Sequence, residues 1–345
     1  MQRSNIILGI LLGTLASTIC FSFISRNQHA DAHSGAANAT LNRKIKVAHA
    51  LPLTHPVHLG IEHFAERLEA LSGGAIVCQI YPSGQLGSET EYIEKLQSGT
   101  LDIAKTSAAP LANFVPRMKV FSLPYLFRDR SHYWDVLDGE IGNELLAALA
   151  TRQNNQASGF RGICYYDAGS RNFYTTTPVT KPSDLSGLNI RVMKDSVAIA
   201  MTEALSASPV PMPGGEIYSA LQKGDINGAE NNPPTFVAQR HFEVCKHFTF
   251  DHHSRIPDVL NISSSLWTKL SDQEKEWVRT AARESSRFQR TLWKKRSDAA
   301  VAEMQAAGVT IHRPDPITFQ QALGNAMSPF LVGEVKSYAK KIQAQ

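Results

Sequence analysis

The segment from Ser271 to Ala307 contains neither glycine nor proline, and it constrains the fold more than any other part of the chain. Ser271 and Glu274 form a capping box at its start. Roughly 37 residues at ~1.5 Å each would make an unbroken helix of about 55 Å. This length exceeds the width of one domain, so we expect the helix to run across two lobes. Two helices with a break near Ser285-Ser286 are the alternative.

The rest of the chain alternates strand-like segments with amphipathic helical segments. Its 345 residues, 43% of them apolar, are enough for one large domain or two ordinary ones with a buried core. The β-α-β-α order predicts an α/β fold with parallel sheets flanked by helices. We expect strands over residues 44–50, 75–81, 101–104, 159–166 and 188–192 and helices over 57–71, 88–99, 134–149, 197–205 and 216–222.

The N-terminal residues 1–32 have the pattern of a signal peptide. An uncharged, mainly apolar stretch over residues 6–24 follows Arg3, and Ala30-Asp31-Ala32 supplies a small-x-small cleavage site. Because the stretch approaches the length of a membrane span, an uncleaved anchor is the alternative. The expected location of the folded protein is the periplasm.

Charge and cysteine content exclude several classes of protein. The formal net charge is +4 and no block of five or six like charges occurs, so we expect no nucleic-acid partner. Cys78, Cys164 and Cys245 remain after cleavage, without a C-x-x-C pair. We interpret them as buried, inert thiols. A Cys164–Cys245 bridge is the alternative in an oxidising compartment.

Catalytic and metal-binding motifs are missing from the sequence. The twelve histidines form no H-E-x-x-H motif, and no cysteine or carboxylate stands at zinc-finger spacing. No G-x-S-x-G nucleophile elbow occurs, and the glycine pairs lack the lysine and hydroxyl of a phosphate loop. We therefore expect no metal, no cofactor and no enzymatic activity. A secreted hydrolase or lyase that uses a histidine–carboxylate pair is the alternative from another class.

Two arginines and one polar turn indicate a site for an organic anion. Arg191 interrupts the alternating segment 188–192, Arg171 follows a strand-like segment, and residues 225–234 lead from a strand into a proline-rich turn. Ligands gather at the carboxyl ends of strands in open α/β sheets. Arginine can grip a carboxylate there through two parallel hydrogen bonds. For Arg191, a position on the solvated face of the sheet is the alternative.

Six further motifs follow one another along the chain: YPSGQLG (81–87), LPYLF (123–127), GSR (169–171), DLSGLNIRV (184–192), EIYSALQ (216–222) and NGAEN (227–231). Together they resemble the motifs of the TRAP (tripartite ATP-independent periplasmic) transporter solute-binding proteins. The likeness covers about residues 44–330, in the order and spacing of that family.

The resemblance implies a two-lobe α/β fold of the periplasmic-binding-protein type, class II, with hinge-crossing strands and a long helix spanning both lobes. We expect one lobe over residues 41–166 plus 257–296 and the other over 167–256 plus 297–345. Such a protein is a monomeric receptor that captures a small hydroxylated organic acid and delivers it to the membrane permease of a TRAP-type secondary transporter. A periplasmic sensor for a signalling partner shares this fold and is the alternative.

The resemblance also implies the residues that hold the acid. Arg191 stands where the family's carboxylate-clamping arginine stands, and Arg171 matches its second ligand arginine. Asn231 corresponds to the asparagine that orients the ligand from the hinge side. Glu230 and His253 belong to the surrounding network.

The expected substrate follows from the same likeness. Glu89 and His49 stand where they would read the hydroxyl groups of a ligand. Ala50 and Ser107 replace an asparagine and a glutamate of the sialic-acid branch, so sialic acid is not expected. The closest likeness is to the branch that binds hexuronates such as galacturonate or glucuronate, although Gly214-Gly215 replaces an aromatic wall of the pocket. C4-dicarboxylates and 2-oxo acids are the alternatives.

Overall fold

A computed structural model describes residues 42–152 and 155–345 of the chain. The predicted signal peptide, residues 1–32, lies outside these residues. No helix in the described ranges is both long enough and apolar enough to cross a membrane.

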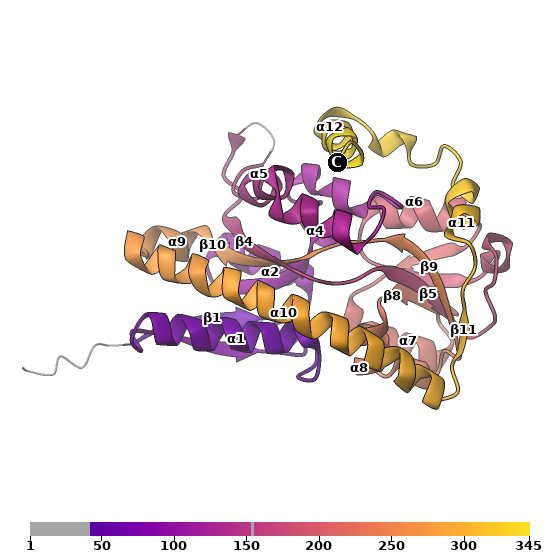
Figure 1. The fold of residues 1–345 in the computed structure, drawn as a ribbon, viewed down its shortest axis with the longest axis horizontal. Coiled ribbons are helices and arrows are strands. Elements are labelled where there is room, and N and C mark those ends of the chain that lie inside the picture. Colours follow the sequence, from indigo (N-terminus) through magenta and orange to yellow (C-terminus); the bar gives the residue numbers. More distant parts are fainter. Residues whose placement is uncertain (1–41, 153–154) are drawn as a thin grey trace, which may run out of the picture. The chain divides into compact units, whose positions relative to one another are not determined.

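Two β-sheets form the framework (Figure 1). The first has the strand order β2-β1-β3-β10-β4 and the second the order β11-β9-β5-β8-β6-β7. The strands are β1 (Arg43–Ala48), β2 (Ile76–Tyr81), β3 (Ile103–Ser107), β4 (Phe160–Tyr166), β5 (Arg171–Thr175), β6 (Asn189–Val192), β7 (Ser208–Pro211), β8 (Gly228–Asn231), β9 (His247–Ser254), β10 (Asp258–Ser263) and β11 (Thr310–His312).

Both sheets are mixed, whereas the sequence predicted parallel ones. The prediction is right for β1, which runs parallel to β2 and β3, and for β6, which runs parallel to β7 and β8. It is wrong for β10, which is antiparallel to β3 and β4, and for β5, which is antiparallel to β8 and β9. The chain leaves the first sheet through β4 and β5 and returns through β9 and β10. The outgoing and returning strands therefore lie side by side in opposite directions.

The helices that the sequence predicted are present, except that one of them is divided into two. Ser88 forms the expected capping box, and Gly99 ends that helix in the left-handed conformation with φ 74°. The helix predicted over 134–149 is instead two helices, because Gly139 is extended (ψ −171°) and cannot continue either of them. The α-helices are α1 (Pro56–Leu71), α2 (Glu89–Ser98), α3 (Ala108–Leu111), α4 (Arg130–Asp138), α5 (Glu140–Ala148), α6 (Ser196–Ala204), α7 (Ile217–Lys223), α8 (Pro233–Ala238), α9 (Ser264–Lys269), α10 (Asp272–Ala306), α11 (Pro316–Ala322) and α12 (Gly333–Gln343). The 3₁₀ helices are η1 (Pro116–Ser122), η3 (Pro182–Leu185), η4 (Gly214–Glu216), η5 (His241–Glu243) and η6 (Ser328–Phe330).

Helix α10 is continuous over 35 residues, with Ser271 in the predicted capping box. The alternative of a break at Ser285-Ser286 is wrong, because both serines are buried against β4. Ser285 Oγ lies 2.9 Å from the Tyr166 hydroxyl, and Ser286 donates to the Tyr165 carbonyl at 2.6 Å. The helix packs on α1 and β4 at one end and on α8 toward the other, so it extends from the first sheet to the helix that follows β8 of the second (Figure 1).

A glutamine on α10 holds the first chain crossing between the sheets. The peptide N–H of Asp167, directly after β4, donates to Gln289 Oε1 at 2.8 Å. Gln289 Nε2 donates to the Asp167 carbonyl at 2.9 Å. Gln289 is fully buried, so each of these bonds satisfies a backbone group that water does not reach. The helix thereby fixes the peptide from which the chain leaves the first sheet.

Contacts group Leu41–Gln345 as one compact unit. The predicted bounds of the two lobes stay a prediction. The C-terminal helix α12 packs against η1 and α5.

The three cysteines of the described residues are free thiols. Cys164 lies on β4 and Cys245 follows η5, and both are buried, while Cys78 is half-buried. Burial raises the pKa of each thiol to about 12, so the reactive thiolate is disfavoured.

Candidate functional site

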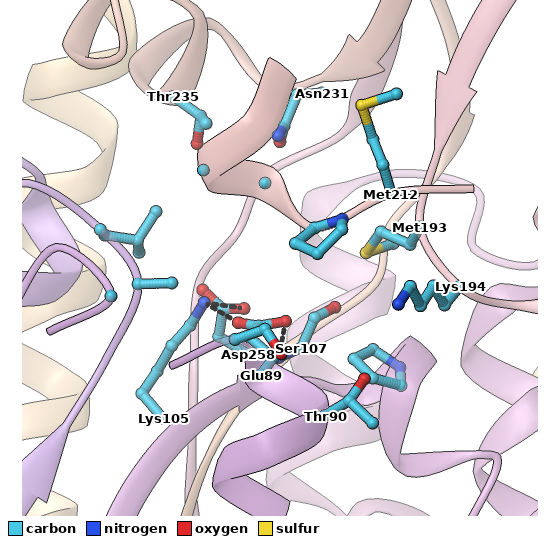
Figure 2. Close-up of a pocket in the computed structure, with 18 of the residues that line it drawn as sticks. Glu89, Thr90, Lys105, Ser107, Met193, Lys194, Met212, Asn231, Thr235 and Asp258 are labelled. Carbon is cyan, nitrogen blue, oxygen red and sulfur yellow. Dashed lines mark hydrogen bonds and ion pairs between the residues drawn. The ribbon is translucent and has the colours of Figure 1, made fainter. Parts of the chain in front are cut away.

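A cavity of about 580 Å³ lies where the two sheets present the carboxyl ends of their parallel strands. Its lining includes residues that follow β1 and β2, residues on β3 and β10, and residues on β5, β6 and β8. Such a position is where open α/β sheets bind ligands, and the volume is within the range of small-molecule sites. Figure 2 shows Asn231 and Thr235 on one side of the cavity and Glu89, Lys105 and Asp258 on the other.

Arg191 is a buried cation with no ion-pair partner in the described part of the chain. It lies on β6 and only 4% of it is exposed. Its Nε and Nη2 donate to the Met212 carbonyl at 2.9 and 2.6 Å, and no carboxylate of the described residues forms an ion pair with it. Burial lowers the pKa of Arg191, and the nearby Glu230 offsets this only in part. The guanidinium lines the cavity and can accept an anion as its missing partner.

Arg171 is fully compensated, in contrast to Arg191. It begins β5 and forms a buried ion pair with Glu230 of the neighbouring β8. Its Nη2 donates to the Glu230 carbonyl at 2.7 Å and to Oε1 at 2.8 Å. Burial alone would raise the pKa of Glu230, but Arg171 and His253 hold it at about 2. Arg171 is therefore a fixed cation whose charge is already matched.

Behind this pair lies a chain of buried ionisable groups. His253 Nδ1 is 2.8 Å from Asp251 Oδ2, and its Nε2 is 3.4 Å from Glu230 Oε2. Burial alone would lower the pKa of His253, but the two carboxylates raise it to about 9. The imidazolium holds Glu230 in place, and Glu230 in turn positions Arg171 at the cavity.

Asn231, at the carboxyl end of β8, has a fixed amide orientation. Its Oδ1 accepts from Asn232 N–H at 2.9 Å, from Asn232 Nδ2 at 3.1 Å and from Arg171 Nη1 at 3.3 Å. Three donors on the oxygen assign the other atom as nitrogen, so Nδ2 remains a donor at the cavity.

The opposite wall carries a cluster that we call the carboxylate–lysine trio: Glu89, Lys105 and Asp258. Lys105 Nζ lies 2.9 Å from Glu89 Oε1 and 2.9 Å from Asp258 Oδ1 (Figure 2). Ser107 N–H donates to the other Glu89 oxygen at 3.2 Å. Burial alone would lower the pKa of Lys105, but the two carboxylates raise it. Burial, and to a smaller extent Glu89, raise the pKa of Asp258.

The backbone explains why these three side chains meet. Glu89 is the first residue of α2, directly after its Ser88 cap. Lys105 lies on β3, and β10 pairs with β3 so that Asp258 stands opposite Ser107. The trio thus joins one helix start to two adjacent strands of the first sheet.

His55 and Thr235 join the two sides of the cavity. His55 Nδ1 accepts from Val57 N–H at 3.2 Å as the cap of α1, so the proton of the neutral ring is on Nε2. That Nε2–H donates at 3.1 Å to Thr235 Oγ1 on α8. Burial lowers the pKa of His55 well below its usual value, so the ring is neutral.

Four of the predicted site residues line the cavity: Arg191, Arg171, Asn231 and Glu89. Glu230 and His253 lie behind Arg171, as described. His49 is not among the lining residues, and both of its ring nitrogens are engaged. Its Nδ1 accepts from Leu51 N–H at 3.2 Å and its Nε2 donates to His58 Nδ1 at 2.9 Å. The structure therefore does not bring His49 together with the other predicted residues.

Sequence reasoning missed Lys105, Asp258, His55 and Thr235, which all line the cavity. A lysine inside the otherwise uncharged strand β3 (IAKTS) was the available signal for the first of these. The predicted glycine pair Gly214-Gly215 also lines the cavity, and open space surrounds the place of a Cβ at either glycine. Within the described ranges, no group of three His, Cys, Asp or Glu side chains is arranged to hold a metal ion.

Comparisons with known proteins identify the class. Residues 47–334 match the family model DctP, described as bacterial extracellular solute-binding protein, family 7. The match covers most of the chain, which therefore belongs to this family. The chain is a solute-binding receptor of the TRAP type, as the sequence predicted, with the two-lobe α/β fold of such proteins.

Particular relatives show which ligands similar proteins hold. A TRAP periplasmic solute binding protein from Xanthobacter autotrophicus Py2, with bound β-D-galacturonate, is 34% identical with a TM-score of 0.83, covering 87% of this chain and 99% of that one. One from Citrobacter koseri, with bound D-glucuronate, is 36% identical with a TM-score of 0.83, covering 87% of this chain and 98% of that one. The C4-dicarboxylate-binding periplasmic protein DctP of Rhodobacter capsulatus is 32% identical over 267 residues, 77% of this chain and 78% of its own length.

Proposed function

We propose that this receptor binds a hexuronate, such as galacturonate or glucuronate, in the cavity between its two sheets. The observation that carries the proposal is the buried guanidinium of Arg191, which lines the cavity without a carboxylate partner. A ligand carboxylate supplies that partner. Arg171 adds a second, fixed set of donors, and Asn231 Nδ2 orients the ligand.

The trio on the opposite wall suits the hydroxyl-bearing end of such a ligand. Glu89 and Asp258 present carboxylate oxygens that accept hydrogen bonds from hydroxyl groups, and Lys105 has one N–H left after its two ion pairs. The ligand therefore contacts elements of both sheets. The ligand stabilises the conformation in which elements of both sheets contact it. Because it binds that conformation more tightly than any other, it raises the fraction of receptor molecules that adopt it.

Transport completes the proposal. The protein is exported by its N-terminal segment, acts as a monomer in the periplasm and passes the bound acid unchanged to a TRAP-type membrane permease. The buried arginine and the paired carboxylates serve recognition and carry out no chemical step.

Thermal-shift and calorimetric titration of the mature chain, from about His33, test the proposal. The panel contains galacturonate, glucuronate, the neutral sugars galactose and glucose, C4-dicarboxylates and 2-oxo acids. A ligand at 100 times its Kd adds about 2.7 kcal/mol to the free energy of unfolding. We expect this with a hexuronate and no shift with the neutral sugars. Binding of another acid alone would replace the substrate, and no binding of any acid would contradict the receptor site.

A further inference from the structure

We propose that the carboxylate–lysine trio is a charge filter, which admits the hydroxyl-bearing end of a monocarboxylate and rejects a second carboxylate. This inference rests on the proposed function, since it assumes that the ligand's first carboxylate binds Arg191. It assigns Glu89, Lys105 and Asp258 a role in specificity beyond hydrogen bonding to hydroxyl groups.

The charges of the trio do not cancel. Two carboxylates share one ammonium, which leaves one excess negative charge on that wall. The side chains of Lys105 and Asp258 are only 5% and 8% exposed, so solvent screens this charge weakly. The ammonium is already neutralised by these carboxylates, so its remaining N–H can donate a hydrogen bond, but its charge does not offset that of a second ligand anion.

The charges across the cavity allow one ligand anion. Within residues 42–152 and 155–345, Arg191 has no ion-pair partner, while Arg171 is matched by Glu230. Both arginines and the trio line the same cavity, so a ligand there faces both walls. A monocarboxylate completes the pairing at Arg191. A second carboxylate against the trio would meet a like charge, which disfavours binding roughly 250-fold at ~5 Å and an effective dielectric constant of about 20.

The relatives make this question specific, because one is named for C4-dicarboxylates and two solved structures hold hexuronates. Galactarate serves as the dicarboxylate probe and galacturonate as the monocarboxylate. The quantity measured is the ratio of their Kd values, by calorimetry, in the wild type and in variants. The difference in ligand shape is the same in every variant and cancels when the ratios are compared.

Asp258→Asn and Glu89→Gln each remove the excess charge and leave Lys105 with one partner. We expect each variant to shift the ratio at least tenfold toward galactarate. Glu69→Gln removes the same charge at an exposed position on α1 outside the cavity, and its ratio should stay within about twofold of the wild type. If Asp258→Asn fails to fold, Glu89→Gln carries the test, because Glu89 is 21% exposed at a helix start.

Two results overturn the filter and leave the proposed function intact. One is an unchanged ratio in both variants while galacturonate still binds. The other is a wild type that binds galactarate as tightly as galacturonate. A wild type that binds neither acid overturns the filter together with the proposed function.

Discussion

Replacing Arg191 by methionine should separate ligand binding from folding. In the proposed complex the guanidinium is the main partner of the ligand carboxylate in a buried site. Removing one member of a buried, hydrogen-bonded charge pair costs about 2–5 kcal/mol of binding free energy. The Kd should therefore rise between about 30-fold and a few thousandfold.

Folding should respond very differently. Methionine leaves the Met212 carbonyl without its two donors, which costs about 1–3 kcal/mol. The same change removes a buried cation that has no ion-pair partner, which offsets much of that cost. We expect the free energy of unfolding of the ligand-free protein to stay within about 2 kcal/mol of the wild type.

Arg171→Met is the matched control, because it removes an equally buried arginine that does have a partner. It leaves Glu230 buried, with only His253 at 3.4 Å to stabilise its charge. Loss of one partner of a buried ion pair costs about 3–5 kcal/mol of stability. Urea denaturation without ligand gives the stabilities, and titration with the hexuronate gives the affinities. Near-normal affinity in Arg191→Met, or a stability loss as large as that of Arg171→Met, would refute the reasoning.

Three further predictions concern the framework of the site. Gly228→Ala should lower the melting temperature, since a Cβ there would come 2.4 Å from a carbonyl oxygen of the neighbouring strand. Gly214→Ala is the control: its Cβ meets nothing within 4 Å, so the melting temperature should stay unchanged. The free energy of unfolding should fall as pH rises from about 6.5 toward 9, because the folded-state pKa of His253 is raised to about 9. The protonated imidazole contributes its full stabilisation only below the pKa of the unfolded chain, and this contribution is lost as pH rises through the folded-state pKa. In His253→Gln, the stability should depend less on pH over this range. Gln289→Leu should cost about 2–5 kcal/mol in urea denaturation by leaving two buried backbone groups unsatisfied, while Gln305→Leu, exposed on the same helix, should not.

Local signals predicted the longest helix and its ends. The absence of glycine and proline, with a serine cap, predicted α10 to within a residue at its start, because capping depends on atoms close in sequence. The break between α4 and α5 was missed, because no residue beside Gly139 indicates that it adopts the extended conformation that ends α4.

The candidate site was predictable where it lies in ordered motifs and not where it depends on sheet pairing. Arg191, Arg171, Asn231 and Glu89 stand within or beside motifs whose order indicated their roles. Lys105 was missed partly because the predicted strand ended at residue 104, whereas β3 continues to residue 107.

Asp258 shows the limit of sequence reasoning more sharply. No pattern in the sequence around Asp258 indicates that it contacts Lys105 or lies near Glu89. Their meeting depends on β10 inserting between β3 and β4 in antiparallel register, which is a property of the whole sheet. The contact between His49 and His58 is likewise not evident from the sequence, because it depends on where helix α1 packs, and a role of His49 in reading ligand hydroxyl groups stays a prediction.

The charge arrangement of the cavity explains why a receptor keeps an arginine that its own fold does not satisfy. A carboxylate from the chain beside Arg191 would stabilise the ligand-free protein, but every ligand would then have to displace it. Arg171 has such a carboxylate in Glu230 and therefore contributes a fixed geometry. Arg191 has no such carboxylate among the residues that the structure describes, so in the proposed complex it contributes binding free energy. In the proposed complex, burial of this cation destabilises the ligand-free receptor, and the ligand carboxylate relieves that destabilisation when it binds. The affinity for the anion then depends on the instability that burial creates at Arg191.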